Sequence, residues 1–218
     1  MKIRIINNQG FTLVELLVVI VIIAALAGVG MPLGKSLLTR SHAVHCSQNL
    51  RQIGLAAMMY AGDNNMTLPV TTHQRVKGGK SWTLSLQPYA AGTITFKCHQ
   101  DHNVARSYTY AINDFLTPNP SGAPDLNFSI LAKIDRPQAT LLFAEAAPSY
   151  DSADHFHFTE YHGGQIPPAV FESQVAVKMH GDKANYLFAD GHVETLSWSE
   201  IRTRLASGGS RFVDPSVR

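Results

Sequence analysis

The chain has 218 residues, of which 16% are charged and 45% are hydrophobic, and its formal net charge is +2. This length allows one ordinary domain with a hydrophobic core beside one membrane-spanning helix. The first 60 residues carry five basic residues and one acidic residue, a balance of +4, whereas the rest carries 13 basic and 15 acidic residues, a balance of −2. The larger part of the chain therefore lacks the composition of a broad cationic face, and no nucleic-acid partner is expected.

The most unusual stretch lies near the start of the chain. From Phe11 to Met31 the only charged residue is Glu15, and nearly all the others are Leu, Val, Ile, Ala or Gly. A helix of this length spans about 30 Å, the thickness of the hydrocarbon core of a bilayer. The sequence therefore predicts a transmembrane helix over residues 11–31. A carboxylate at bilayer depth costs roughly 2.5 kcal/mol or more, so Glu15 is expected to have a functional partner.

This stretch resembles the start of type IV prepilins and type II secretion pseudopilins. The resemblance rests on a short basic leader with Lys2 and Arg4, then Gly10, then Phe-Thr-Leu-Val-Glu from Phe11 to Glu15. In that family a membrane-bound prepilin peptidase cleaves after the glycine and methylates the new amino-terminal Phe. The acidic residue at the fifth mature position pairs with the new amine of a neighbouring subunit. The resemblance thus implies a leader of residues 1–10, processing between Gly10 and Phe11, and Glu15 as the assembly carboxylate.

The same resemblance implies a single-pass inner-membrane protein with a cytoplasmic amino terminus and a periplasmic or extracellular head. Two other interpretations compete for the apolar run. A secretory signal peptide would be cleaved behind its apolar core, and Ala24–Gly28 would be the site. Glu15 inside that core and Gly10 ahead of it do not fit a signal peptide. A plain membrane anchor gives Glu15 no role.

Residues 32–62 are predicted to continue the same helix. Pro32 ends the apolar run, but a proline usually kinks a membrane helix without ending it. An apolar stripe then recurs at steps of three and four residues, as on one face of a helix, and comprises Cys46, Leu50, Ile53, Ala57 and Tyr60. We expect one helix of about fifty residues whose distal half packs on a globular head, and Gly62–Asn65 is expected to end it.

Residues 63–206 are predicted to form this head, an α+β domain whose antiparallel sheet packs on the distal half of the helix. Short β-like runs alternate there with Gly, Pro, Asn and Asp. The expected elements are a short helix from residue 81 to about 89, strand-like runs over 93–96 and 107–111, a central strand over 140–144, and loops over 119–124 and 148–168. The tail, residues 207–218, is expected to be loose.

The clearest local signal is a β-hairpin near the end of the chain. Runs over 185–189 and 192–196 flank Asp190-Gly191, a pair that favours a type I′ turn. Ser197 and Glu200 have the spacing of a capping box, which predicts a last short helix over 200–205.

A second resemblance concerns the head. His180, nine residues, then Asp190-Gly191 resembles a C-terminal H-x9-DG signature of a large group of prepilin-like proteins, and Asn185 and His192 lie within or beside it. Heads of that group also carry a Cys-x-x-Asn-Leu-Arg-Gln-Ile-Gly helix and a later Phe-x-Cys, matched here by 46–54 and 96–98. One departure is that His99 stands where the group commonly has Pro. The resemblance implies architecture and export, and it supplies no activity for the head.

Two places in the head contain residue types that bind metals. His180, Asp190 and His192 are possible zinc ligands, but a hydrogen-bonded structural latch, with His180 bonded to a loop carbonyl, is the preferred interpretation. Asp63-Asn64-Asn65 is oxygen-rich and suits calcium, yet a helix-ending turn explains it more simply. Further histidines lie in the expected loop, at His155, His157 and His162. No cofactor is therefore expected, although zinc or calcium stays open.

Cys46 and Cys98 are the only cysteines. The topology implied by the resemblance places both in an oxidising compartment, and both are expected to point into the head, so a disulfide between them is predicted. The alternative is two buried free thiols, since cysteine packs well as a small apolar residue.

No nucleophile elbow, phosphate-binding glycine loop or His-Glu-x-x-His motif is present, so an enzyme is not expected. The predicted function is a membrane-anchored, pseudopilin-like structural subunit that assembles through its amino-terminal helix into a secretion or pilus-type filament. The partners expected are the membrane, the prepilin peptidase and other pilin-like subunits. The alternative is an exported binding module for a glycan or a secreted cargo, with or without a divalent ion. A cluster of exposed aromatic residues on the head would favour that alternative.

Overall fold

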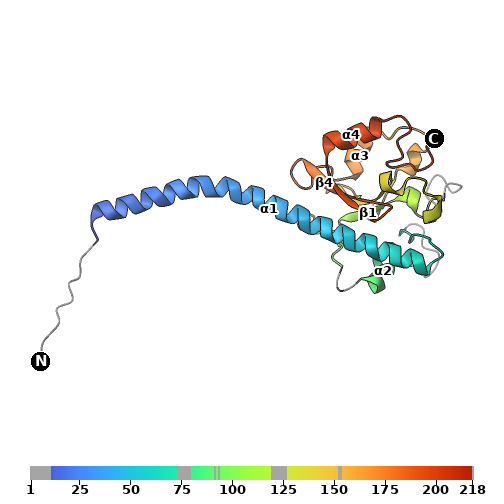
Figure 1. Ribbon diagram of the computed structural model, residues 1–218, viewed down its shortest axis with the longest axis horizontal. Coiled ribbons are helices and arrows are strands. Elements are labelled where there is room, and N and C mark those ends of the chain that lie inside the picture. The colour runs from blue at the N-terminus through green and yellow to red at the C-terminus, as the bar shows by residue number, and fades with distance from the viewer. Residues whose placement is uncertain are drawn as a thin grey trace, which may run out of the picture. The chain divides into compact units, whose positions relative to one another are not determined.

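A computed structural model describes residues 11–72, 80–90, 92, 94–118, 127–151 and 154–217, without the side chains of 29–36. The chain divides into two compact units, Met1–Arg40 and Ser41–Arg218. Helix α1, Leu13–Asp63, forms the described part of the first unit and opens the second (Figure 1). Its 51 residues confirm the predicted helix of about fifty residues and its end before Asn64. The predicted leader, residues 1–10, lies outside the described residues.

In the first unit, every described side chain from Phe11 to Gly28 is exposed. A search of the described helices for a segment with the length and apolarity needed to cross a bilayer finds none. The last three residues of the predicted span, 29–31, have side chains outside the described part.

The second unit is built on a five-stranded sheet with strand order β3-β1-β2-β4-β5. The strands are β1 Tyr110–Asn113, β2 Leu141–Glu145, β3 His155–Phe156, β4 Lys183–Phe188 and β5 Val193–Ser197. Strand β2 is central, as predicted. All pairs are antiparallel except β1 with β3, which is parallel. The predicted α+β, pilin-like arrangement is therefore confirmed, but the sheet is mixed and not wholly antiparallel.

Helix α1 packs on one face of this sheet, and two short helices, α3 (Pro168–Gln174) and α4 (Trp198–Ala206), pack on the other (Figure 1). The predicted short helix is present as α2, Trp82–Ser85, with a 3-10 turn behind it. The remaining 3-10 turns are Asp114–Leu116, Leu131–Lys133, Pro137–Ala139 and Thr159–Tyr161.

The core between α1 and the sheet contains the predicted apolar stripe. Four of its five residues, Cys46, Leu50, Ile53 and Ala57, are fully buried, and Tyr60 is half-buried. Gly54 lies on the same face, where a Cβ atom would come within 2.9 Å of Leu187 Cδ1 on β4. The missing side chain of Gly54 thus allows a close approach of the helix to β4 at this point.

The core on the other face is closed by the carboxyl-terminal tail, which the sequence led us to expect to be loose. Phe212 is buried and its ring lies against Phe171 and Tyr186. Its carbonyl accepts a hydrogen bond from the Leu141 amide, and the side chain of Asn113 donates to the Val213 carbonyl. The expectation was wrong because the two apolar residues Phe212 and Val213 cover one face of the sheet.

Several local predictions also need correction. The hairpin is confirmed, but its turn is not type I′, since Gly191 has a φ of 91° and Asp190 does not have a positive φ. The Gly191 amide instead bonds to the Phe188 carbonyl, as in a type I turn followed by a left-handed glycine. Of the run over 93–96, the described residues 94–96 form no strand, and β3 lies inside the expected loop over 148–168.

The last helix begins with the predicted capping box, in which Ser197 and Glu200 each bond to the backbone amide of the other. It is longer than predicted, since α4 extends over Trp198–Ala206.

Candidate functional site

The first turn of α1 joins two residues of the prepilin-like motif. Thr12 precedes the helix, and both its amide and its hydroxyl donate to Glu15 Oε2, at 2.8 Å and 2.7 Å. The Glu15 amide in turn donates to the Thr12 hydroxyl at 3.2 Å. This reciprocal pattern is a capping box, so Glu15 satisfies amide donors at the helix start. Gly10 lies outside the described residues, and Phe11 directly behind it is 84% exposed.

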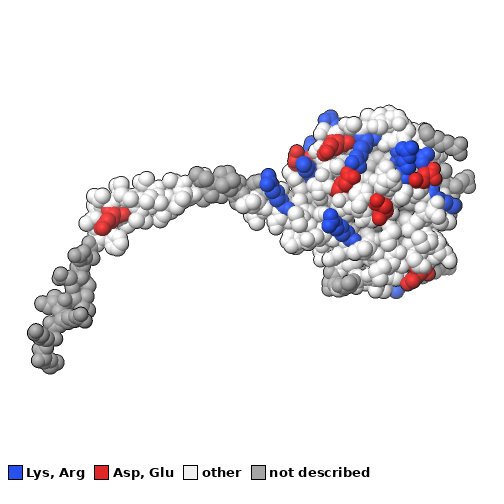
Figure 2. All heavy atoms as spheres, viewed as in Figure 1, with Lys and Arg blue, Asp and Glu red and all other residues white. Residues whose placement is uncertain are grey.

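The helix surface around Glu15 is apolar on every side. Glu15 is the only charged residue from Phe11 to Gly28, and Figure 2 shows this stretch as almost wholly uncharged apart from one acidic patch. A helix that is apolar all round has no stable position in water and requires lipid or other apolar helices around it. On the head, by contrast, basic and acidic residues alternate over the face seen in Figure 2, without a continuous basic area.

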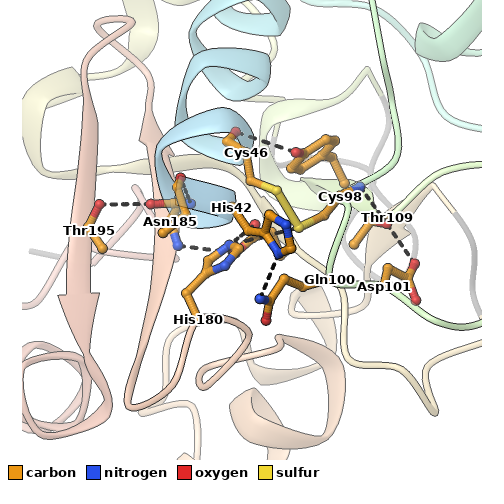
Figure 3. Close-up of a disulfide and its surroundings, with 12 residues drawn as sticks. His42, Cys46, Cys98, Gln100, Asp101, Thr109, His180, Asn185 and Thr195 are labelled. Atoms are coloured by element: carbon orange, nitrogen blue, oxygen red, sulfur yellow. Dashed lines mark hydrogen bonds and ion pairs between the residues drawn. A yellow bond between two sulfur atoms is a disulfide. The ribbon is translucent and has the colours of Figure 1, made fainter. Parts of the chain in front are cut away.

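The predicted disulfide is present between Cys46 on α1 and Cys98 in the loop that leads to β1 (Figure 3). The two α-carbons are 5.5 Å apart, within the usual range for a disulfide, and both cysteines are buried. The turn that follows Cys98 forms without a proline at position 99, because the Asp101 amide donates to the Cys98 carbonyl. The bridge thus ties the helix to the segment that enters the sheet.

Asp101 holds this turn in place. Its buried carboxylate accepts a hydrogen bond from the Thr109 hydroxyl (Figure 3) and another from the Arg106 guanidinium, both at 2.6 Å. Burial opposes ionisation of Asp101, but these hydrogen bonds and the Arg106 charge outweigh it and hold the pKa of the carboxyl below its usual value. Thr109 also accepts a hydrogen bond from the Cys98 amide, so the network fixes the backbone of that cysteine.

A buried acid–base pair lies beside the disulfide. His180 Nε2 is 2.7 Å from Glu145 Oε1, at the end of β2, and 3.8 Å from Cys98 Sγ. Both side chains are almost completely buried. The other carboxylate oxygen of Glu145, Oε2, accepts a hydrogen bond from the backbone amide of Asn185. The His180 ring thus bonds to a carboxylate and not to the loop carbonyl that we expected.

The charge of Glu145 acts on two buried tyrosines, Tyr110 and Tyr186. Burial, and after it the charge of Glu145, raises the pKa of Tyr110 and of Tyr186 well above the usual value. The Tyr110 hydroxyl donates to the Cys46 carbonyl.

Asn185 ties the same region to the helix. Its side-chain amide donates to the Ala43 carbonyl on α1 at 3.0 Å, and its oxygen accepts a hydrogen bond from the Thr195 hydroxyl on β5 at 2.7 Å (Figure 3). Asn185 therefore joins both strands of the hairpin to the helix. Two of the residues singled out in the signature, His180 and Asn185, thus lie at the contact between helix and sheet.

The remaining signature residues lie at the other end of β4 and do not meet His180. Asp190 accepts a hydrogen bond from the His192 amide, and the His192 ring lies between the carboxylates of Asp190 and Glu194. Burial lowers the pKa of His192, but the hydrogen bonds to these two carboxylates outweigh it and raise the pKa. Because β4 separates the two groups, His180, Asp190 and His192 do not form one metal site.

The other candidate ligand groups have structural partners. At the helix end, Asn64 donates to the Tyr60 carbonyl and Asp63 accepts from the Tyr89 hydroxyl, as suits a helix-ending turn. His155 is buried in β3 between Asp154 and His157, with both nitrogen contacts at 2.8 Å. His162 lies 3.3 Å from a carboxylate oxygen of Asp214.

The cluster of exposed aromatic residues that would favour a binding module is not found on the described part of the head. Each Phe, Tyr and Trp described there is buried or half-buried. One surface hollow is lined by Phe128, Lys133, Asp135 and Arg211, together with residues of the tail.

Sequence reasoning missed Glu145 altogether. The available signal was a single acidic residue directly behind the apolar run Thr140–Ala144. A carboxylate at the end of a buried central strand requires a partner, and this requirement points to a histidine or an amide elsewhere in the head.

A comparison with protein families finds one match, to the prokaryotic N-terminal methylation motif, over residues 6–31. This match supports a type IV pilin-like prepilin. Neither the curated proteins nor the solved structures contain a match to the chain.

Proposed function

We propose that the protein is a membrane-anchored, pseudopilin-like subunit that is cleaved between Gly10 and Phe11 and assembles through α1 into a secretion or pilus-type filament. The observation that carries this proposal is the methylation-motif match over residues 6–31, on a helix whose apolar surface is exposed from Phe11 to Gly28. That surface has no partner within the described chain. Lipid before assembly, and the helices of neighbouring subunits after it, would supply one.

The proposed processing step creates the cation that Glu15 needs. Cleavage behind Gly10 turns the amide nitrogen of Phe11 into an amine, which is a cation even after N-methylation. Glu15 Oε2 is occupied by Thr12, whereas Oε1 accepts no hydrogen bond within the described chain. The carboxylate therefore caps its own helix and still has an acceptor for the amine of a neighbouring subunit. An ion pair of this kind offsets the cost of both charges at bilayer depth.

The proposed role of the head is structural, not enzymatic. Its buried polar groups are used to join α1 to the sheet, as the bonds of Asn185 to Ala43 and Thr195 illustrate. We place the head in the periplasm or outside the cell, since the Cys46–Cys98 bridge suits an oxidising compartment.

The first test of the proposal is the amino terminus of the protein extracted from membranes, read by mass spectrometry. We expect a chain that begins at an N-methylated Phe11. A retained Met1, or an amino terminus near Gly28, would contradict the proposal.

The second test separates assembly from helix capping. Thr12→Ala removes the hydroxyl contacts of the capping box and keeps the carboxylate, whereas Glu15→Ala removes the carboxylate and with it the capping box. We expect both variants to be inserted and cleaved, and we expect only Glu15→Ala to disappear from the sheared filament fraction. If both variants assembled equally well, Glu15 would act only as a helix cap and the proposed assembly role would be wrong.

A further inference from the structure

Four side chains with metal-binding atoms meet at one buried point between α1 and the sheet. They are Cys46, Cys98, Glu145 and His180, and their four ligand atoms all lie within 4.8 Å of one another. Two of them are joined in the disulfide, with His180 beside it (Figure 3), and Glu145 completes the acid–base pair with His180. The structural role assigned to the head does not account for a histidine at 3.8 Å from a disulfide sulfur.

We propose that these four residues form a zinc site when the disulfide is open. Two thiolates, one imidazole nitrogen and one carboxylate oxygen are all ligands that zinc accepts in four-coordinate sites. In a tetrahedral site with Zn–S bonds of about 2.3 Å, the two sulfurs lie about 3.8 Å apart. The sulfurs of Cys46 and Cys98 therefore need only a small separation once their bond is broken, and the histidine and carboxylate are already beside them.

Glu145 and His180, the two proposed ligands other than the cysteines, are held in position by hydrogen bonds to neighbouring residues. The backbone amide of Asn185 donates to Glu145 Oε2 at 3.2 Å. The other carboxylate oxygen, Oε1, faces His180. The backbone of His180 is fixed by its amide, which donates to the Lys183 carbonyl at 2.8 Å. The hydrogen bond to the Glu145 carboxylate is of the kind that orients a metal ligand and raises metal affinity. When His180 Nε2 binds the ion, the ring proton moves to Nδ1, which is buried and has no partner within the described part.

The site exists in only one redox state, because a thiolate binds zinc and a disulfide sulfur does not. Starting from the disulfide, a phosphine reductant breaks the S–S bond: the phosphine takes an oxygen from water, and the two water protons go to Cys46 and Cys98. Zinc then displaces both thiol protons into solvent. In the reverse direction, a protein disulfide takes two electrons from the two thiolates, the S–S bond forms, and the ion is released.

The experiment uses the full chain in detergent, reduced with a phosphine and stripped of metal. We expect the reduced protein to bind one zinc ion per chain and the oxidised protein to bind none. Cobalt in place of zinc should give the charge-transfer absorption of a cobalt–thiolate bond. Zinc affinity should fall at least tenfold in Glu145→Gln and in His180→Gln.

Surface histidines provide the matched control. The His99 ring, next to Cys98 in the chain, has its centroid 6.2 Å from that of His42 and 6.1 Å from that of His45. His99→Ala should leave zinc binding by the reduced protein unchanged. Binding that is lost in His99→Ala but kept in Glu145→Gln and His180→Gln would overturn the proposal, as would equal zinc binding by the reduced and oxidised proteins.

A second measurement does not depend on the folding of a variant. The zinc-loaded, wild-type protein is oxidised with a small disulfide in the presence of a chromogenic zinc chelator. We expect one zinc ion to be released for each Cys46–Cys98 bond formed, with the same time course. Closure of the bond without release of zinc would overturn the proposal.

Discussion

The two halves of α1 are parts of one helix, yet their surroundings differ completely. From Phe11 to Gly28 each side chain is exposed although nearly all are apolar, whereas from Cys46 to Ala61 the apolar side chains on one face are buried against the sheet. The second half buries its apolar face against the sheet, whereas no side chain from Phe11 to Gly28 is buried within the described part of the chain. The difference teaches that the head is held together by its own contacts, while the apolar surface from Phe11 to Gly28 stays available for the lipid and subunit contacts proposed above.

The largest effect that tests this comparison comes from the disulfide. Cys46→Ser with Cys98→Ser opens a bridge between residues 52 positions apart, and we expect the free energy of unfolding of the head to fall by about 4 kcal/mol. Chemical denaturation measures this loss. Leu17→Ala, in the exposed half of the helix, is the control and should leave the unfolding of the head unchanged. A stable head without the bridge would show that helix–sheet packing alone is sufficient.

A second test uses the buried acid Asp114, which follows β1. Burial raises the pKa of its carboxyl to about 6, although hydrogen bonds from Thr159 and Phe158 and the charge of His155 act in the opposite direction. A raised pKa means that the folded state binds the proton more tightly than the unfolded chain does. The contribution of Asp114 to stability is therefore full below about pH 4 and is lost as the pH rises through about 6.

We expect the unfolding free energy of the wild-type protein, minus that of Asp114→Asn, to fall by about 2–3 kcal/mol between pH 4 and pH 7. Denaturation of both proteins at several pH values measures this difference. Glu15→Gln, which alters an exposed acid in the first half of α1, should leave the pH profile of the head unchanged. A difference that rises with pH would mean that the pKa of Asp114 is lowered.

The glycines of α1 test how closely its second half approaches the sheet. A Cβ atom at Gly54 would meet Leu187, whereas one at Gly62 would meet nothing within 4 Å. Gly62→Ala should stabilise the head slightly, by up to about 1 kcal/mol, because alanine favours a helix. Gly54→Ala gains the same helix preference but must displace Leu187, so we expect a net loss of about 1–2 kcal/mol. Equal thermal stability of the two variants would contradict the close packing.

The sequence was informative where a signal is local. The stripe from Cys46 to Tyr60 predicted which face of the helix is buried, and Ser197 with Glu200 predicted the start of α4. Both signals depend on residues within a few turns of one another. The disulfide was predictable for another reason, since a chain with two cysteines allows only one pairing.

The errors concern contacts between distant parts of the chain. Strand β3 has only two residues, and it forms because Ile112 and Asn113 of β1 offer it a parallel partner. The tail is ordered by Leu141 and Asn113, far away in the sequence. The pairing of Glu145 with His180, 35 positions later, is of the same kind. A local pattern can show that a partner is needed, as at Glu145, but it does not identify the partner, because the partners come together only when the sheet forms.

The smallest expected effect is that of the hairpin turn. Asp190 accepts hydrogen bonds only at the exposed tip of the hairpin, from the amide and ring of His192, so Asp190→Ala should cost about 1 kcal/mol. The matched control is Asp182→Ala, which removes an exposed acid at the other end of β4 and should cost less. Thermal unfolding of both variants measures the difference. Because Asp190 follows β4 whereas His180 precedes it, loss of the Asp190 carboxylate should change neither processing at Phe11 nor zinc binding by the reduced protein. A change in zinc binding in Asp190→Ala would mean that the two ends of β4 act together, contrary to the separation of His180 from Asp190 described above.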